Sequence, residues 1–195
     1  SIALSAVDRS AMKPDITPDI KNPEGYELDT SGGIIRIRAG GPRGAFYATR
    51  TLRQLVDGGD GYLPSVFIKD EPAFPYRGFM LDSARHMTSV DDIKKLIDAA
   101  ALLKMNVFHW HLTDDQDWRF DVPDYPALTQ IGAWRSGSDF GKVHSSERYG
   151  GYYTPAEIRD VVAYCAKQHI EVIPEVDMPG HMIAAIASYP HLSCT

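Results

Sequence analysis

Two hydrophobic periods follow one another in the first 72 residues. Apolar and polar side chains alternate from Ile34 to Arg38, which predicts a strand, and Tyr26 to Leu28 is predicted as a second extended segment. From Ala45 to Val56 the apolar residues recur at helical spacing, and a Gly-Gly pair then ends the pattern. These residues predict a small accessory α+β domain over residues 1–72.

The pattern of predicted elements changes after residues 64–75, which contain several prolines and no periodic signal. We place the domain boundary there, near residue 72, so the second domain covers residues 73–195. Thr154, Pro155 and Glu157 supply an N-cap, a proline at the first helical position and a capping-box glutamate. Strands and helices alternate in this domain, with strands expected at 77–82, 106–112 and 170–176 and helices expected after Ser89, after Thr154 and over 183–187.

Strands that alternate with helices predict an α/β domain with a parallel sheet and right-handed crossovers. A doubly wound sheet and a (β/α)8 barrel both fit this order. A complete barrel typically needs ~250 residues. The chain has 195 residues, so we expect at most a partial barrel made of its first three strand–helix units.

Composition excludes some classes of function. The net charge is −6, and no run of Lys and Arg is present that would bind nucleic acid. No apolar stretch approaches the ~18 residues of a membrane span. The chain begins at Ser1 without a signal-peptide pattern. Cys165 and Cys194 make no disulfide framework. We therefore expect neither a nucleic-acid partner nor a membrane partner.

Charged and hydrogen-bonding side chains gather where the expected strands end. In parallel α/β folds the chemistry lies at the carboxyl ends of the strands. Taken singly, each of these residues could be a surface ion pair, a turn residue or a helix cap. Because all three strands show the same pattern, the set predicts a functional site, comprising Asp82, Arg85 and His86, then Asp114 and Asp115, then Glu175, Asp177 and His181.

A histidine pair adds a second interpretation. His109 and His111 lie two residues apart on one strand, so their side chains point to the same face. With Asp114 or His181 they could bind a metal, which makes a metal-dependent barrel hydrolase the alternative enzyme. Otherwise both histidines hydrogen-bond to neighbouring acids inside the barrel. Aromatic residues near the same rim either stack on sugar rings or pack under a long loop; these are Trp110, Trp118, Trp134, Tyr152 and Tyr153.

Several segments, taken in order, closely resemble a known family. They are Arg77–His86, Lys104–Gln116 and Ile173–His181, together with Glu24–Tyr26 and Gly44–Leu55 nearer the N-terminus. The resemblance is to glycoside hydrolase family 20, the β-N-acetylhexosaminidases, in which an accessory α/β domain precedes a catalytic TIM barrel. It implies removal of terminal β-linked N-acetylglucosamine or N-acetylgalactosamine with retention. The substrate's own acetamido oxygen is the nucleophile, an exception to the two-carboxylate scheme.

The resemblance also implies roles for particular residues. Arg85 matches the arginine that holds the sugar's 3- and 4-hydroxyls, for which a forked cationic donor is suited. Asp114 matches an aspartate that hydrogen-bonds a histidine, and His181 matches that histidine, which lies close to the general acid. Asp177 matches a further acid that binds substrate. His111 and Glu175 are expected behind these residues.

The family needs no metal or cofactor. Its substrates are N-acetylhexosamine-terminated oligosaccharides and glycoconjugates, and its members are secreted, periplasmic or lysosomal, which we expect here by resemblance alone.

Two departures from the family pattern matter. Asp117 stands where the family usually has a small residue, and we expect its carboxylate at the rim of the site. The Asp-Glu pair expected after the fourth strand does not occur in this chain, so we expect the chain alone to be an inactive fragment. The remaining alternative is a non-catalytic sugar-binding remnant.

Overall fold

The computed structural model describes residues 2–3, 13–137 and 147–194. Contacts within the chain divide it into two compact units. The first comprises residues 1–77 and 100–105, and the second comprises residues 78–99 and 106–195. Part of the loop-rich stretch 113–153, namely 138–146, lies outside the described residues. In the part of the chain that is described, no helix has the length and apolar character needed to cross a membrane.

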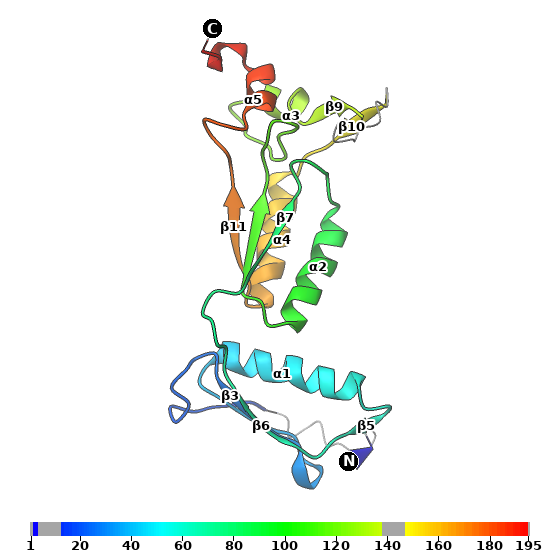
Figure 1. Ribbon diagram of the computed structural model, residues 1–195, viewed down its shortest axis with the longest axis vertical. Helices are drawn as coiled ribbons and strands as arrows, with labels where there is room; N and C mark the ends of the chain where they lie inside the picture. Colours follow the sequence, from blue (N-terminus) through cyan, green and yellow to red (C-terminus); the bar gives the residue numbers. More distant parts are fainter. Residues whose placement is uncertain (1, 4–12, 138–146, 195) are drawn as a thin grey trace. The chain divides into compact units, whose positions relative to one another are not determined.

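The first unit is a four-stranded sheet with one long helix packed on it (Figure 1). Tyr26, Leu28, Ile37 and Tyr47 are buried between the sheet and the helix. The order of strands in the sheet is β2 (Asp15–Ile16), β4 (Arg36–Ala39), β3 (Tyr26–Asp29) and β6 (Phe67–Asp70). The helix is α1 (Pro42–Asp57), and a 3-10 turn covers Ser31–Gly33. A separate pair of short strands is formed by β1 (Ile2–Ala3) and β5 (Tyr62–Leu63).

Strand β6 was not predicted, because prolines on both sides hide its pattern. Phe67–Asp70 lies within the proline-containing stretch assigned to the linker, yet it pairs antiparallel with β3 along all four residues. The side chains of β6 alternate between exposed and half-buried and contribute little to the core. The ladder to β3 therefore defines this strand, and a search for hydrophobic periodicity cannot detect it.

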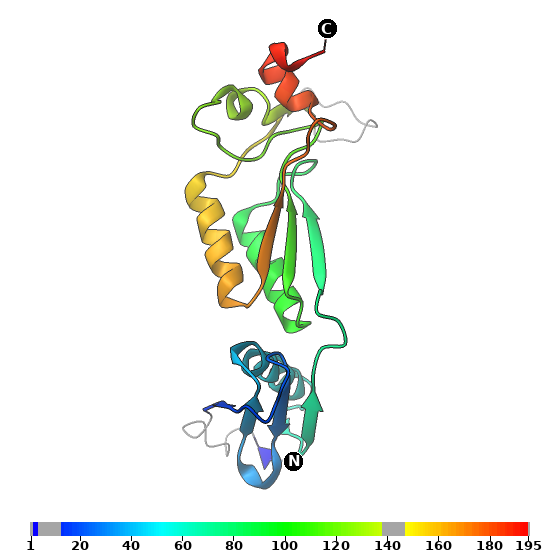
Figure 2. The same cartoon turned by 90° about the vertical axis from the view of Figure 1, so that its left-hand side faces the viewer.

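The second unit is built on three parallel strands. Their order is β7 (Gly78–Asp82), β8 (Val107–His111) and β11 (Glu171–Glu175), with β8 in the centre. Helices α2 (Val90–Leu102) and α4 (Pro155–Lys167) cover the same face of this sheet (Figure 2). Side chains join the two helices, since Lys94 Nζ lies 2.6 Å from Asp160 Oδ2 and the Tyr164 hydroxyl donates to Asp98 over 2.7 Å.

Successive strands added in one direction, with both helices on one face, are the winding of a (β/α)8 barrel. A doubly wound sheet carries helices on both faces. The three described strands form an open sheet, so the structure is a partial barrel preceded by a small α+β domain. The predicted fold class is confirmed.

Local signals place the helices of this unit. The Thr154 hydroxyl accepts a hydrogen bond from Glu157 N, and the Glu157 carboxylate accepts one from Thr154 N, which confirms the capping box of α4. Ser89 caps α2 in a similar way by accepting from Asp92 N. The buried side of α4 includes Val161 and Cys165, whereas Val162 is 44% exposed.

The loops above the strands contain elements that periodicity did not predict. They pack near the carboxyl ends of the sheet, around a small core of Trp118, Leu128 and Ala185. These elements are the short helix α3 (Ala127–Gln130) and the hairpin of β9 (Trp134–Ser136) with β10 (Arg148–Gly150); the predicted helix α5 (Ile183–Ser188) and a final 3-10 turn, Pro190–Leu192, follow β11.

Candidate active site

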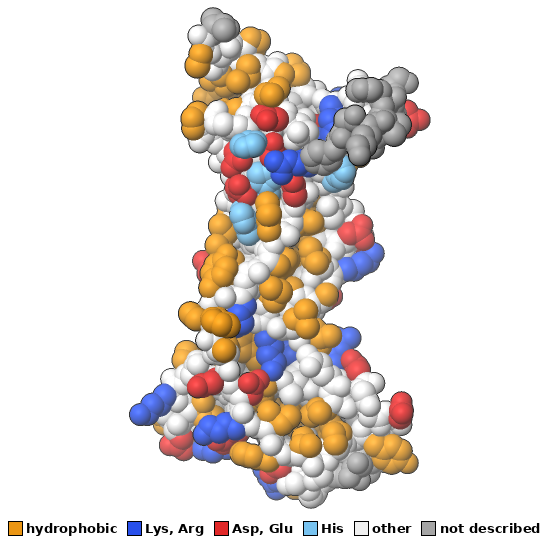
Figure 3. Space-filling model, in the orientation of Figure 1, with side chains coloured by type: hydrophobic (Ala, Val, Ile, Leu, Met, Phe, Trp, Pro, Cys, Tyr) orange, Lys and Arg blue, Asp and Glu red, His pale blue; other side chains and the backbone are white. Residues whose placement is uncertain are grey.

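The last residues of the three parallel strands are in register with one another. Asp82 of β7 pairs with His111 of β8, and His111 pairs with Glu175 of β11. Acidic, basic and histidine side chains gather on the surface around these strand ends (Figure 3). The row of Asp82, His111 and Glu175 is therefore the floor of the site, and the loops that follow the strands supply the groups above it.

Arg85 is held by carboxylates from two strand ends. Its backbone N–H donates to Asp82 Oδ1 over 2.9 Å, and its Nη1 donates to Asp82 Oδ2 over 2.7 Å. Its Nη2 lies 2.5 Å from Asp114 Oδ2. The hydrogen bond to Asp82 raises the pKa of Arg85 above its usual value. The side chain is still 30% exposed, so a fixed guanidinium remains accessible to a ligand.

Asp114 lies at the centre of the site, where it contacts Arg85, His111 and His181. Its side chain is 1% exposed. Oδ2 lies 2.9 Å from His111 Nε2, and Oδ1 accepts the backbone N–H of Asp115 over 2.7 Å. Burial by itself would raise the pKa of Asp114, but the hydrogen bonds from His111 and Asp115 and the charge of Arg85 lower it below its usual value. The carboxylate is thus ionised although it is buried.

His181 lies on the open side of Asp114. Its Nδ1 is 3.2 Å from Asp114 Oδ1 and 3.7 Å from Asp115 Oδ2, and its side chain is 54% exposed. The interpretation of His181 as a helix cap does not apply, because the Asp115 carboxylate accepts the first free N–H of α5, that of Ile183. With Nδ1 toward Asp114, the Nε2 edge of the ring faces away from it.

Glu175 joins both histidines of β8. Its Oε2 lies 2.5 Å from His109 Nε2 and 2.8 Å from His111 Nδ1. Burial would lower the pKa of His111, but its contacts with Asp114 and Glu175 raise it above the usual value. Both predicted histidines therefore lie against the Glu175 carboxylate.

Asp177 is tied to the same group from the loop after β11. Its backbone N–H donates to Thr113 Oγ1 over 2.9 Å. Burial and the neighbouring Glu175 carboxylate raise the pKa of Asp177, whereas His111 outweighs burial and lowers that of Glu175. The pKa values of these two carboxyls are thus shifted in opposite directions. The six residues to which the family resemblance assigned roles all lie in this network or directly against it, namely Arg85, His111, Asp114, Glu175, Asp177 and His181.

The contacts bear on the metal-site alternative. Among the described residues, the groups that could hold an ion are His111 with Asp114 and Asp177, and Asp114 with Asp115 and His181; His109 is in neither. Asp114 Oδ2 already receives the guanidinium of Arg85 at 2.5 Å. A second cation beside it would be repelled, so the geometry favours a network of ion pairs over a metal centre.

Asp117 does not lie where the sequence indicated. We expected an additional carboxylate at the rim, but Asp117 is fully buried. Its Oδ2 receives hydrogen bonds from Arg119, over 2.6 Å, and from Arg135. The prediction was wrong because the turn between Thr113 and Trp118 directs Asp114 and Asp115 toward the site and Asp117 into the protein.

Arg119 is among the polar residues that follow the second strand, but sequence reasoning assigned no role to it or to Arg135, because neither arginine lies in a distinctive pattern. Of the aromatic residues, Trp110, Trp118 and Tyr153 are buried and pack beneath the loops. Trp134 is half-buried under the guanidinium of Arg148, 4.0 Å above the ring. Packing is therefore the role of most of them.

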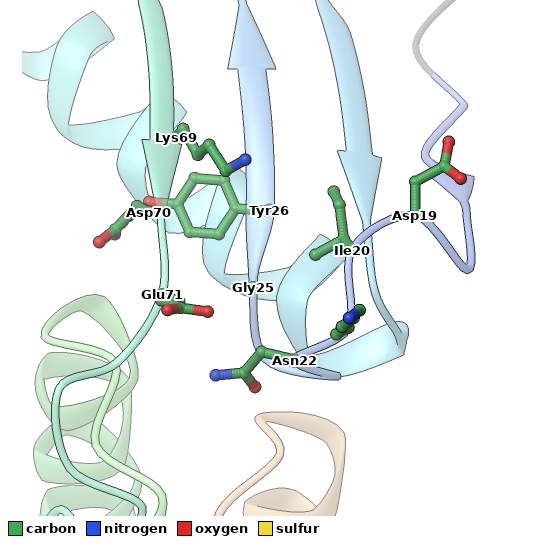
Figure 4. Close-up of a pocket in the computed structure, with 9 residues that line it drawn as sticks. Asp19, Ile20, Asn22, Gly25, Tyr26, Lys69, Asp70 and Glu71 are labelled. Atoms are coloured by element: carbon green, nitrogen blue, oxygen red, sulfur yellow. Dashed lines mark hydrogen bonds between the residues drawn. The ribbon is translucent and has the colours of Figure 1, made fainter.

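The first unit has a hollow of about 400 Å³ beside β3 and β6 (Figure 4). Tyr26 forms part of its wall, and its hydroxyl donates to Asp70 over 2.7 Å. Asp19 pairs with Arg38, and Lys69 pairs with Glu27. Because these groups are engaged with one another, we place the candidate chemistry at the strand ends of the second unit.

Comparison with known proteins decides the family. The model of the glycosyl hydrolase family 20 catalytic domain matches residues 74–195, and the model of that family's domain 2 matches residues 2–71. This chain belongs to glycosyl hydrolase family 20. A β-hexosaminidase of Porphyromonas gingivalis is 47% identical over 180 residues, and one of Vibrio furnissii is 46% identical over 170 residues.

A family 20 exo-β-N-acetylglucosaminidase of Vibrio harveyi, solved in complex with N-acetylglucosamine, superposes with a TM-score of 0.83 at 43% identity. That match covers 92% of this chain and 29% of the solved one. The two β-hexosaminidase matches cover 88% and 85% of this chain but 22% and 28% of those relatives. The chain thus spans less than a third of the length of these family 20 proteins.

Proposed function

We propose that this chain is the sugar-holding part of a retaining β-N-acetylhexosaminidase that removes terminal β-linked N-acetylglucosamine or N-acetylgalactosamine. The observation that carries the proposal is Arg85, a partly exposed guanidinium fixed by Asp82 and Asp114 at the carboxyl ends of the strands. Its forked N–H groups match two adjacent hydroxyls of a sugar. The names of the relatives, β-hexosaminidase and N,N′-diacetylchitobiase, support this substrate class.

Each residue then has a defined task. Arg85 binds the 3- and 4-hydroxyls of the terminal sugar, and Asp177 contributes a second polar contact. Asp114 holds Arg85 on one side and His181 on the other. His181 presents Nε2 toward the position of the general acid, whose proton supply it tunes. His111 keeps Asp114 ionised and oriented, and Glu175 holds the other nitrogen of the His111 ring.

The proposed chemistry is substrate-assisted. The acetamido oxygen attacks the anomeric carbon and forms an oxazolinium-type intermediate while a glutamic acid protonates the leaving oxygen; water then opens the intermediate with retention. No metal and no cofactor takes part. The glutamate and the aspartate that orients the acetamide belong to a segment that this chain does not contain. General acid catalysis alone contributes ~10²–10⁴-fold, so the 195-residue chain by itself is expected to be inactive.

The test is hydrolysis by the full-length protein. It should release p-nitrophenol from p-nitrophenyl N-acetyl-β-glucosaminide, and it should not act on the matched β-glucoside, which lacks the acetamido nucleophile. The 195-residue chain serves as the control and should release none. Equal rates on both substrates would exclude the substrate-assisted route, and no release by the full-length protein would exclude the function. Export to the periplasm, the exterior or a lysosome is part of the same proposal and is tested by fractionation.

A further inference from the structure

A buried charge cluster lies directly behind the site. Asp117 and Arg119 are both completely buried, and the side chain of Arg135 is 18% exposed. Asp117 Oδ2 accepts from both arginines, while its Oδ1 has no hydrogen-bond partner among the described residues. Removing a carboxylate from water has a large free-energy cost, so this arrangement calls for an explanation beyond filling space.

The two arginines donate to three consecutive backbone carbonyls. Arg119 Nε donates to Ser83 O over 2.8 Å, and Arg119 Nη2 donates to Ala84 O over 3.0 Å. Arg135 Nη2 donates to Arg85 O over 2.6 Å. These carbonyls belong to the turn that leaves β7 and carries the Arg85 side chain into the site. The guanidiniums of Arg119 and Arg135, which share the Asp117 carboxylate, therefore fix the backbone of the turn that carries Arg85.

Asp117 also belongs to the turn that presents Asp114. The carbonyl of Asp117 accepts the backbone N–H of Asp114 over 3.1 Å. Asp114 in turn contacts the guanidinium of Arg85. Asp117 thus connects the backbone of Arg85, through the arginines, with the acid that holds the Arg85 side chain.

We propose that Asp117 is a positioning residue for sugar binding, because it anchors Arg119 and Arg135 and they fix the turn that carries Arg85. The proposal rests on the proposed function for its kinetic readout. Without the carboxylate, the buried guanidinium of Arg119 and the partly exposed one of Arg135 have no shared anion, and the turn over Ser83–Arg85 loses its rigid support. The guanidinium of Arg85 can still donate hydrogen bonds to a sugar, but the turn no longer holds it in one position.

The experiment compares Asp117→Asn with wild type in the full-length protein. Because the interaction with Arg85 is present in both the bound sugar and the transition state, its loss raises KM more than it lowers kcat. We expect KM for p-nitrophenyl N-acetyl-β-glucosaminide to rise about tenfold and kcat to fall less than about threefold. Arg135→Gln, which removes the bonds from the guanidinium to the Arg85 carbonyl, to Asp117 and to the Gly137 carbonyl but keeps the Asp117 carboxylate and Arg119, should show the same split if Asp117→Asn does not fold.

Two controls separate positioning from general destabilisation. Thr154→Ala removes the cap of α4, which has no contact with Arg85 in the described structure, and it should leave KM unchanged. In an Arg85→Lys background, Asp117→Asn should change kcat/KM by less than about twofold, because the two substitutions act on one interaction. Additive losses, or a KM unchanged in both Asp117→Asn and Arg135→Gln, would overturn the proposal.

A second readout does not depend on activity. Amide hydrogen exchange of residues 83–87 should become faster in Asp117→Asn, and it should be unaffected in Thr154→Ala. If the wild-type protein shows no hexosaminidase activity, the proposed function fails and this exchange experiment still decides the positioning role. Unchanged exchange over 83–87 in Asp117→Asn would overturn it.

Discussion

The guanidinium of Arg85 lies 2.5 Å from the carboxylate of Asp114, which is almost completely buried. Arg85 follows β7 and Asp114 follows β8, so the contact joins two strand ends that are distant in sequence. One partner is partly exposed and the other is not, which leaves the arginine able to bind a ligand while its position is fixed.

Arg85→Lys should reduce kcat/KM of the full-length protein on an N-acetyl-β-glucosaminide by about 10²-fold, that is about 2.7 kcal/mol. A lysine keeps the charge but has no fork, so it cannot contact Asp82 and Asp114 and still bind two hydroxyls. Steady-state kinetics measure the effect. Arg53→Lys, at an arginine paired with Asp57 and 63% exposed, is the matched control and should change nothing. An Arg85→Lys enzyme with wild-type kinetics would rule out the assigned role.

Asp114 should make the protein sensitive to acid. Its pKa in the folded protein lies below the usual value, so its stabilising effect is present above about pH 4 and is lost as pH falls through the folded pKa. Asp114→Asn should therefore lower the melting temperature at pH 7, and the difference from wild type should shrink on acidification. Melting curves at pH 7, 5 and 3 test this. A difference that grows toward pH 3 would have the wrong sign.

His111 should have the opposite dependence. Its folded pKa is raised above the usual value despite burial, because Asp114 and Glu175 stabilise the protonated ring. The stabilisation is complete below about pH 6.5 and is lost as pH rises through the folded pKa. We expect His111→Gln to be less stable than wild type at pH 6 and to approach it at pH 9. His191→Gln, at an exposed histidine, is the control variant.

Chelation should leave the activity unchanged. A metal at Asp114 would lie beside the Arg85 guanidinium, because Asp114 Oδ2 already contacts Arg85 and His111. Prolonged EDTA treatment followed by assay tests this, with metal analysis of the purified protein alongside. Stoichiometric zinc, together with activity that is lost on chelation and restored by zinc, would establish the metal-dependent alternative instead.

Thr154→Ala should destabilise the protein by about 1 kcal/mol, since it removes both hydrogen bonds made by the hydroxyl at the start of α4. Thr154→Ser keeps the hydroxyl and is expected to remain near wild type. Denaturant unfolding monitored by helix content measures the difference. Equal losses in both variants would show that the methyl group, not the cap, matters.

Sequence patterns predicted the elements whose signals are local. The cap at Thr154, the helix after Ser89 and the strand ending at His111 all follow from neighbouring residues. The strand-end rule then led to Arg85, Asp114 and His181, because parallel strands bring their carboxyl ends together wherever they lie in the sequence.

Features that depend on tertiary contacts were not accessible in this way. The partner of Phe67–Asp70 is a strand that lies about forty residues earlier, and its own side chains show little burial. The direction of Asp117 depends on a tight turn that directs Asp114 and Asp115 toward the site and Asp117 into the protein. The role of Arg119 and Arg135 can be recognised only from the backbone carbonyls to which they donate.

The in-register row of Asp82, His111 and Glu175 limits how the length of this chain can change. Side chains of a strand alternate between two faces, so one inserted or deleted residue within β8 or β11 would turn every following side chain to the other face. The Glu175 carboxylate would then lose its contacts with His109 and His111. Chimaeras that exchange segments between relatives should therefore join them in the connecting loops and keep each strand intact from its first residue to its last.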